Sequence, residues 1–299
     1  MNGPTASELD AFLEAHRLPN KFRAVIEDHY LPLARWIRGV KTPRTEIVGI
    51  SGAQGTGKST LADFLRVSLE RECGWSVATL SLDDFYLTRA ERRQLSKNVH
   101  PLLITRGAPG THDLELCIRF MKALKLLEPD RRLEIPRFDK ADDDRFPAHQ
   151  WPTVTGPIDL IILEGWCLGA GPQEPKALTK PINKLETTRD PDGAWRAYVN
   201  DRLRTAYTAF FATIDRLVFL RAPDFKAVHR WRLEQERKLA EKAGETNRGI
   251  MDETQLAEFL QHFERLTRTS IELLPETADV ILNLDENHLV TRSDYRRRT

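Results

Sequence analysis

The stretch GISGAQGTGKST, residues 49–60, constrains the fold of this 299-residue chain more than any other segment. An apolar run with the β-branched residues Ile47, Val48 and Ile50 leads into it, and an apolar pattern at helical spacing begins at Leu61. Glycines separate the two patterns, and glycine is the residue that most readily makes a tight turn. The segment therefore predicts a strand, a glycine loop and a helix in direct succession.

A loop of this kind is suited to binding phosphate, because its backbone N–H groups point into one concavity that the N-terminus of the next helix completes. The residues fit the pattern G-x-x-x-x-G-K-[ST], in which the lysine, here Lys58, reaches the β- and γ-phosphates and the hydroxyl, here Ser59, binds Mg²⁺. We expect ATP and Mg²⁺ as cofactors. The predicted nucleotide-binding residues are Gly52, Ala53, Gln54, Gly55, Thr56, Gly57, Lys58, Ser59 and Thr60.

The composition limits the partners and the location. The 45 basic and 44 acidic residues nearly balance, so no overall field attracts nucleic acid or a membrane surface. The three cysteines are far apart and form no C-x-x-C pair, which favours a reducing compartment. The N-terminus lacks a basic and apolar leader, and no apolar run approaches the length of a membrane span. We expect a soluble, cytoplasmic protein with a small-molecule substrate; the oligomeric state is left open.

Strand and helix patterns alternate along the chain, which predicts an α/β fold with a parallel sheet covered on both faces. Residues 1–44 are expected to form an N-terminal helical extension, broken at Pro19 and Pro32, and residues 45–299 the main domain. The segment 169–193, rich in proline and glycine, is expected to leave the core. Further strand patterns occur in 76–87, 158–165, 214–223 and 278–284, the last before a basic tail, and helices are predicted near 113–127, 194–213 and 224–243.

Polar residues that end the predicted strands are the candidates for catalysis, because ligands of an open α/β sheet lie beyond the carboxyl ends of its strands. Asp83 and Asp84 follow the second strand, where one carboxylate can accept a proton from a hydroxyl that attacks the γ-phosphate. Glu164 ends the most apolar strand, so we predict that it supports Mg²⁺ together with Ser59. A turn aspartate and a structural glutamate are the alternatives.

Two further segments and one helix carry candidate ligand-binding residues. RGAPGTHD contributes Arg106 and His112, and PRFDK contributes Arg137 and Lys140, a set suited to an anionic small molecule. A helix-entry loop and solvated surface pairs are the alternatives. The charged helix near 224–243 is predicted to be a lid whose Arg230 and Arg232 neutralise the transferring phosphoryl group, although most charge runs are solvated faces.

GAQGTGKST, SLDDFY and DLIILEG, in this order, resemble the motifs of the P-loop small-molecule kinases that include uridine kinase, phosphoribulokinase and bacterial pantothenate kinase. The resemblance implies a three-layer P-loop NTPase fold with a mainly parallel sheet, and it implies that Asp83 is the base. Lys58 and Glu164 complete the expected catalytic set. Asp84 and Tyr86, from the same motif, are expected to contact the substrate.

RGAPGTHD, IPRFDK, LEGWCLG and HRWRLEQE are similar to segments of a narrower group, the glycerate 3-kinase family. The resemblance runs from about Ile47 to Asp285 and implies phosphorylation of D-glycerate to 3-phosphoglycerate. The residues alone leave other acceptors open, namely pantothenate, a nucleoside or a phosphorylated sugar, and also a non-kinase ATPase. A guanine-specific switch is not favoured, because NKLE at 183–186 lacks the aspartate of N-K-x-D.

Overall fold

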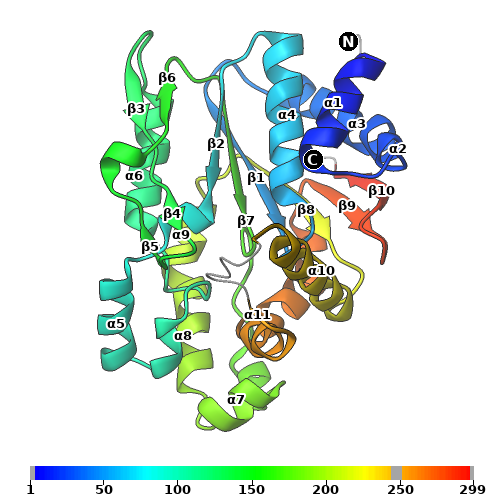
Figure 1. Cartoon of the computed structure of the whole chain (residues 1–299). Helices are drawn as coiled ribbons and strands as arrows, with labels where there is room; N and C mark the ends of the chain where they lie inside the picture. The colour runs from blue at the N-terminus through cyan, green and yellow to red at the C-terminus, as the bar shows by residue number, and fades with distance from the viewer. Residues whose placement is uncertain (1–3, 244–250, 297–299) are drawn as a thin grey trace.

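The computed structural model describes residues 4–243 and 251–296, and its centre is a six-stranded sheet (Figure 1). The strand order is β10-β9-β8-β1-β7-β2, and every neighbouring pair is parallel except β9 and β10. The strands are β1 (Glu46–Gly52), β2 (Val77–Ser81), β7 (Leu160–Gly165), β8 (Arg216–Arg221), β9 (Val280–Leu284) and β10 (Val290–Tyr295). The predicted mainly parallel α/β sheet is confirmed.

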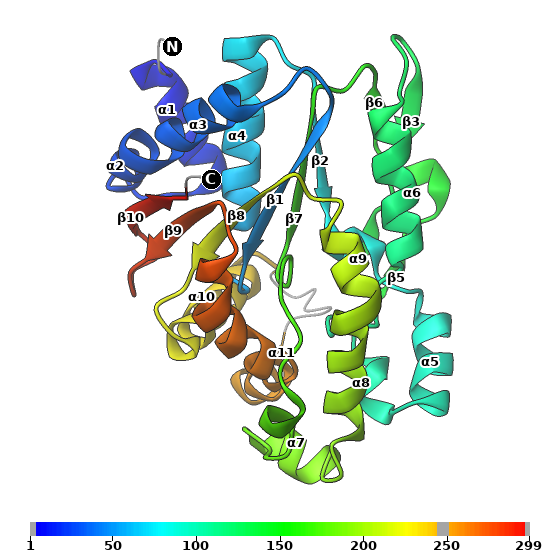
Figure 2. The same ribbon diagram turned by 180° about the vertical axis from the view of Figure 1, so that it is seen from behind.

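Both faces of the sheet are buried, as the side chains of β7 show. Leu160 and Ile162 belong to one apolar core, and Ile161 and Leu163 belong to another on the opposite face. The N-terminal helices and α4 (Lys58–Cys73) cover the first face, and α6 (Leu114–Lys125) and α9 (Thr208–Phe211) cover the second (Figures 1 and 2). Helix α8 (Ala194–Arg202) precedes α9 and lies beyond the carboxyl end of the sheet. The result is the expected arrangement of three layers.

The N-terminal helices are α1 (Ala6–His16), α2 (Phe22–Val25) and α3 (Leu31–Val40). The chain breaks between α1 and α2, around Pro19, as predicted, but the predicted break at Pro32 is wrong. A π-helical turn over Ile26–Tyr30 joins α2 to α3 without interruption. This wider turn accommodates Pro32, which has no N–H to donate and would collide with the preceding turn of a regular α-helix.

The predicted basic tail contains a strand that the sequence pattern does not reveal. Residues 290–295 form β10, which pairs antiparallel with β9 and covers the edge of the sheet. Most of its side chains are partly or fully exposed, so it lacks an apolar stripe; Val290 is buried and Tyr295 stands beside Trp36. Backbone pairing rather than side-chain pattern forms this strand.

The remaining elements lie around the carboxyl end of the sheet or beside α6 (Figures 1 and 2). The helices predicted near 113–127, 194–213 and 224–243 are present, and the segment 169–193 extends beyond the sheet. The other α-helices are α5 (Arg89–Asn98), α7 (Lys184–Arg189), α10 (Phe225–Ala243) and α11 (Glu253–Leu273). Short hairpins pair β3 (Arg132–Glu134) with β6 (Thr153–Thr155) and β4 (Phe138–Asp139) with β5 (Asp144–Arg145). Short helical turns are Leu82–Phe85, Pro101–Ile104, Ala148–Gln150, Pro175–Leu178, Leu203–Tyr207 and Leu274–Glu276.

Candidate active site

The glycine loop lies between β1 and the first turn of α4, as predicted. Gly57 precedes α4 with a φ of 89°, a conformation that favours glycine. Lys58 Nζ donates a hydrogen bond of 3.0 Å to the Ala53 carbonyl, and the buried Thr56 hydroxyl donates to the same carbonyl at 2.8 Å. The lysine thus folds back over the loop, above the N-terminus of α4, which is the place where a helix best receives phosphate.

Helix α10 approaches this loop closely. A β-carbon on Gly55 would lie 3.2 Å from Trp231 Cβ, and the Arg232 backbone nitrogen is 3.7 Å away. Gly55 also has a φ of 79°, so both space and backbone conformation favour glycine here. The two predicted lid arginines therefore start from a helix beside the loop. Arg230 pairs with Glu286 at 3.1 Å, and Arg232 pairs with Glu236 on its own helix.

Glu164 stands near the carboxyl end of β7, in register with Ile50 of β1 and Ser81 of β2. Ser59 Oγ donates a hydrogen bond to Glu164 Oε1 at 3.3 Å. Within residues 4–243 and 251–296, no group of three or more histidine, cysteine or acidic side chains is arranged to hold a metal unaided. Mg²⁺ keeps several waters and commonly uses one or two carboxylates with substrate phosphates, so this hydroxyl and carboxylate fit it.

Asp83 follows β2, and both of its carboxylate oxygens are hydrogen-bonded. Tyr86 Oη donates to Oδ1 at 2.9 Å, and Lys140 Nζ donates to Oδ2 at 2.7 Å. Burial raises the pKa of Asp83, but the charge and hydrogen bond of Lys140, with the Tyr86 hydroxyl, outweigh it and lower the pKa to about 2. Burial lowers the pKa of Lys58, which the nearby Glu164 and Asp83 oppose. An ionised carboxylate therefore lies near the phosphate-loop lysine.

Asp84 points to a different partner. It accepts a hydrogen bond of 2.6 Å from Arg137 Nη1 and one of 3.1 Å from the Phe138 N–H. Burial raises its pKa, and the charge of Arg137 opposes the rise. Asp84 therefore fastens the start of β4 to the end of β2, and Arg137, predicted to contact the substrate, is engaged in this bond.

The two predicted substrate segments come together. Arg106 Nη1 pairs with Asp143 at 2.5 Å, and Arg106 Nη2 donates to the Lys140 carbonyl at 3.3 Å. Asp143 lies in the turn between β4 and β5, so RGAPGTHD and PRFDK border the same surface. The cations Arg106, Arg137 and Lys140 thus gather around the end of β2.

His112 is placed beside these residues, but it does not supply the expected charge. Its ring stacks on Tyr86 at 4.6 Å, and its Nδ1 is 2.6 Å from Tyr207 Oη. Burial lowers the pKa of His112 to about 4, so the side chain is neutral at pH 7 and a cationic His112 is excluded. The Gly110 N–H also donates a hydrogen bond of 3.0 Å to Tyr207 Oη, which fixes the tyrosine beside the His112 ring.

Two side chains that shape this surface were not predicted. Tyr207 orients His112, and the fully buried Arg92 donates to the carbonyls of Leu87, Ile104 and Asp143. Tyr207 occupies an ordinary apolar position of a predicted helix, and Arg92 stands next to an exposed arginine in sequence. No local signal distinguishes either of them.

No family model matches the chain. The chain is 36% identical over 234 residues to an uncharacterized kinase of Schizosaccharomyces pombe, mug58, and the match covers 75% of this chain and 81% of that protein. The chain belongs to the P-loop kinases. This kinase is also 35% identical over 201 residues to a chloroplastic D-glycerate 3-kinase of Arabidopsis thaliana, over 64% of this chain and 41% of the relative.

A solved D-glycerate 3-kinase of Cryptococcus neoformans has a similar structure. The TM-score is 0.72 at 26% sequence identity, and the match covers 89% of this chain and 96% of that one. This protein is therefore an ATP-dependent small-molecule kinase related to D-glycerate 3-kinase. Among the residues that the structure describes, none of the helices combines the length and apolar character needed to cross a membrane.

Proposed function

We propose that this kinase transfers the γ-phosphate of ATP to the 3-hydroxyl of D-glycerate and releases 3-phosphoglycerate and ADP. The observation that carries the proposal is the group of cations at the end of β2: Lys140 contacts the ionised Asp83, Arg137 contacts the adjacent Asp84, and Arg106 lies on the segment that borders them. A small carboxylate gains charge-assisted hydrogen bonds from such a group, and a neutral nucleoside gains none. The similarity to proteins named D-glycerate 3-kinase supports the same acceptor.

In this proposal Asp83 is the general base. The 3-hydroxyl oxygen forms a bond to the γ-phosphorus, its proton passes to Asp83, and the bond from that phosphorus to the β–γ bridging oxygen breaks. Lys58 lies over the phosphate loop, where its charge stabilises the γ-phosphoryl group in the transition state of transfer. Ser59 and Glu164 would hold Mg²⁺, which when bound neutralises phosphate charge.

We further propose that α10 is the lid. Its residues 231 and 232 already lie against Gly55, so a shift of the helix toward the loop would bring Arg230 and Arg232 closer to the phosphates. The pairs of these arginines with Glu286 and Glu236 would then break, and both partners belong to α10 or to the turn before β10.

A screen of acceptors tests the substrate. ATP consumption is measured with D-glycerate, glycerol, pantothenate, uridine and ribulose 5-phosphate, and D-glycerate is expected to give the highest kcat/KM. Glycerol keeps the hydroxyls and lacks the carboxylate, so its kcat/KM measures what the cations contribute. If pantothenate or a phosphorylated sugar is turned over and D-glycerate is not, D-glycerate is not the acceptor. The assignment of the protein as a small-molecule kinase is then unaffected.

Lys58→Ala tests the assignment of the phosphate loop. The variant loses the charge over the β- and γ-phosphates, so phosphoryl transfer should be abolished while the melting temperature stays near that of the parent protein. Lys97→Ala, which changes an exposed lysine of α5, is the matched control and should keep full activity. Full turnover by Lys58→Ala would refute the assignment.

A further inference from the structure

Lys140 is hydrogen-bonded to Asp83, the residue proposed as the general base. Asp83 Oδ1 is held by the buried Tyr86 hydroxyl, which leaves Oδ2 as the oxygen that faces an incoming acceptor. Lys140 Nζ is bonded to this Oδ2 at 2.7 Å. An ammonium proton therefore stands where the acceptor's hydroxyl proton would have to stand.

The lysine reaches Asp83 from the solvent side. The Lys140 side chain is 61% exposed and the Asp83 side chain 27% exposed. A pair this open is only weakly stabilising, because water solvates both partners when they separate. Lys140 can consequently exchange Asp83 for another anion at little cost.

The backbone that carries Lys140 is fixed, so the exchange needs only the side chain. Asp139 accepts hydrogen bonds from the Ala141 and Asp142 N–H groups at 2.8 and 3.2 Å, and Arg106 donates to the Lys140 carbonyl. The other two cations are differently placed. Arg106 is bonded to Asp143 and Arg137 to Asp84, so neither occupies the base.

We propose that Lys140 is a gate on the catalytic base: it caps Asp83 and restrains ATP hydrolysis until an acceptor's carboxylate draws it away. The role of Asp83 as base and the identity of that carboxylate rest on the proposed function, whereas the cap itself rests on the contact between Lys140 and Asp83. When Lys140 leaves, the basicity of Asp83 rises and Oδ2 becomes free for the hydroxyl of the acceptor. Acceptor binding thereby switches the base on.

The gate has a chemical consequence that can be measured without any acceptor. With Oδ2 free, a water molecule can take the place of the hydroxyl: its oxygen bonds to the γ-phosphorus, its proton passes to Asp83, and the bond to the β–γ bridging oxygen breaks, which gives ADP and phosphate. A capped Asp83 disfavours this loss of ATP. Lys140 therefore couples ATP use to the presence of the acid.

The experiment measures phosphate release from ATP and Mg²⁺ in the parent protein and in Lys140→Met, Lys140→Arg and Lys97→Met. Lys140→Met removes the cap, and its acceptor-free hydrolysis should rise by about tenfold, because general-base assistance to water returns. Lys140→Arg keeps a cationic donor that can still bond Oδ2, so its acceptor-free hydrolysis should rise less than that of Lys140→Met. Lys97→Met changes an exposed lysine of α5 and should change nothing.

A second arm adds D-lactate, which has the carboxylate of D-glycerate and a methyl group where the 3-hydroxyl would be. D-lactate should stimulate hydrolysis by the parent protein several-fold and leave Lys140→Met unaffected, because that variant has no cap to release. Unchanged or lower hydrolysis in Lys140→Met, with its melting temperature intact, overturns the gate. A rise in Lys140→Met with no response of the parent protein to D-lactate supports the cap and counts against D-glycerate as the acceptor.

Discussion

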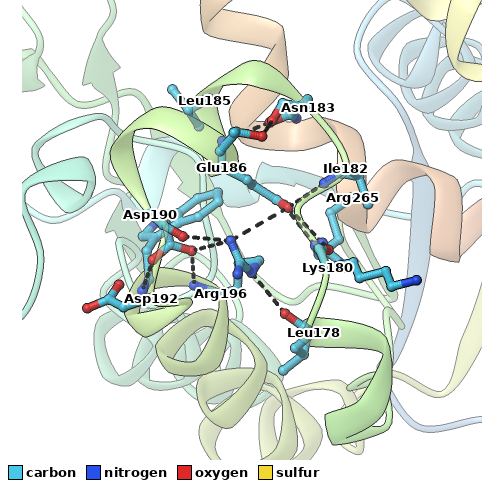
Figure 3. A network of polar contacts seen from close by, with 12 residues as sticks. Leu178, Lys180, Ile182, Asn183, Leu185, Glu186, Asp190, Asp192, Arg196 and Arg265 are labelled. Carbon is cyan, nitrogen blue, oxygen red and sulfur yellow. Dashed lines mark hydrogen bonds and ion pairs between the residues drawn. The ribbon is translucent and has the colours of Figure 1, made fainter.

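Two groups of ion pairs in this kinase both join acidic to basic side chains, but they differ in their access to water. The first consists of Glu186, Asp190, Arg196 and Arg265 and joins α7, α8 and α11 (Figure 3). Its side chains are 0%, 0%, 2% and 12% exposed. The second surrounds Asp83 and Asp84, and there Lys140 and Arg137 are 61% and 35% exposed.

In the buried group nearly every polar atom has a protein partner. Arg196 Nη1 lies 3.0 Å from Asp190 Oδ2, and Arg196 Nε donates to the Leu178 carbonyl. Arg265 binds both oxygens of Glu186, at 2.6 and 2.8 Å. Removing one partner would leave a charge without water or a counter-charge, which is strongly unfavourable. This group therefore has one arrangement and serves the fold.

In the open group the partners can change. Water solvates the charges of Lys140 and Asp83 when they separate, so the pair contributes little to the stability of the fold. A ligand can therefore replace one partner. The comparison teaches that an arginine or lysine next to a carboxylate is structural or functional according to its exposure, which the residue types do not reveal.

The largest effect is expected from Asp83→Asn in the open group. The amide keeps the shape and loses the basicity, so kcat should fall by roughly 10²–10⁴-fold with little change in the affinity for ATP. Steady-state kinetics and nucleotide titration check this. Asp84→Asn is the control, since Asp84 holds Arg137 and Phe138; if that variant loses kcat and Asp83→Asn does not, Asp84 is the base.

Next in size is Arg196→Met in the buried group. The change removes the arginine that pairs with the buried Asp190, so the free energy of unfolding should fall by about 3–5 kcal/mol. Urea unfolding measures it. Arg204→Met, which removes an arginine 54% exposed in a pair with Asp201, should cost about 0–1 kcal/mol. Equal losses in the two variants would contradict the comparison.

His112, which is buried beneath the open group, should make the free energy of unfolding depend on pH. Its pKa is lowered from the usual 6.5 to about 4, so between these pH values the unfolded chain takes up a proton that the folded protein does not. Its contribution to stability is present above pH 6.5 and is lost as the pH falls toward 4, about 2 kcal/mol between pH 7.5 and 5. Urea unfolding at both pH values should show a loss about 2 kcal/mol larger in the parent protein than in His112→Gln, because His29 and His262, whose pKa values burial also lowers, contribute to both proteins. Equal losses in the two proteins would argue against a neutral, buried His112.

A small effect on stability, of the size expected for Arg204→Met, is predicted for Arg137→Ala. Its pair with Asp84 is 35% and 15% exposed, so the free energy of unfolding should fall by no more than about 1 kcal/mol. In the proposed function the same variant harms D-glycerate far more than glycerol, and the ratio of their kcat/KM values should narrow. A ratio that stays constant would remove Arg137 from acceptor binding.

Local patterns predicted the elements of the sheet well and the ion pairs poorly. The almost uninterrupted apolar run of β7 and the glycines of the phosphate loop involve residues a few positions apart, which a sequence displays directly. The segment NKLE at 183–186 shows the contrast. Its residues show only that it does not match the guanine-binding motif N-K-x-D. In the structure, Asn183 caps α7, and Glu186 is bound to Arg265, 79 residues away.

The sequence by itself determined the phosphate loop at 52–60, the alternating strands and helices, and the strand-end positions of Asp83 and Glu164. Each of these follows from backbone conformation and side-chain periodicity within one segment. Only the tertiary structure decided that Lys140 meets Asp83, that Arg137 meets Asp84 and that His112 is buried and neutral. Charge state and pairing depend on burial and on contacts between segments distant in the chain, and no local pattern contains that information.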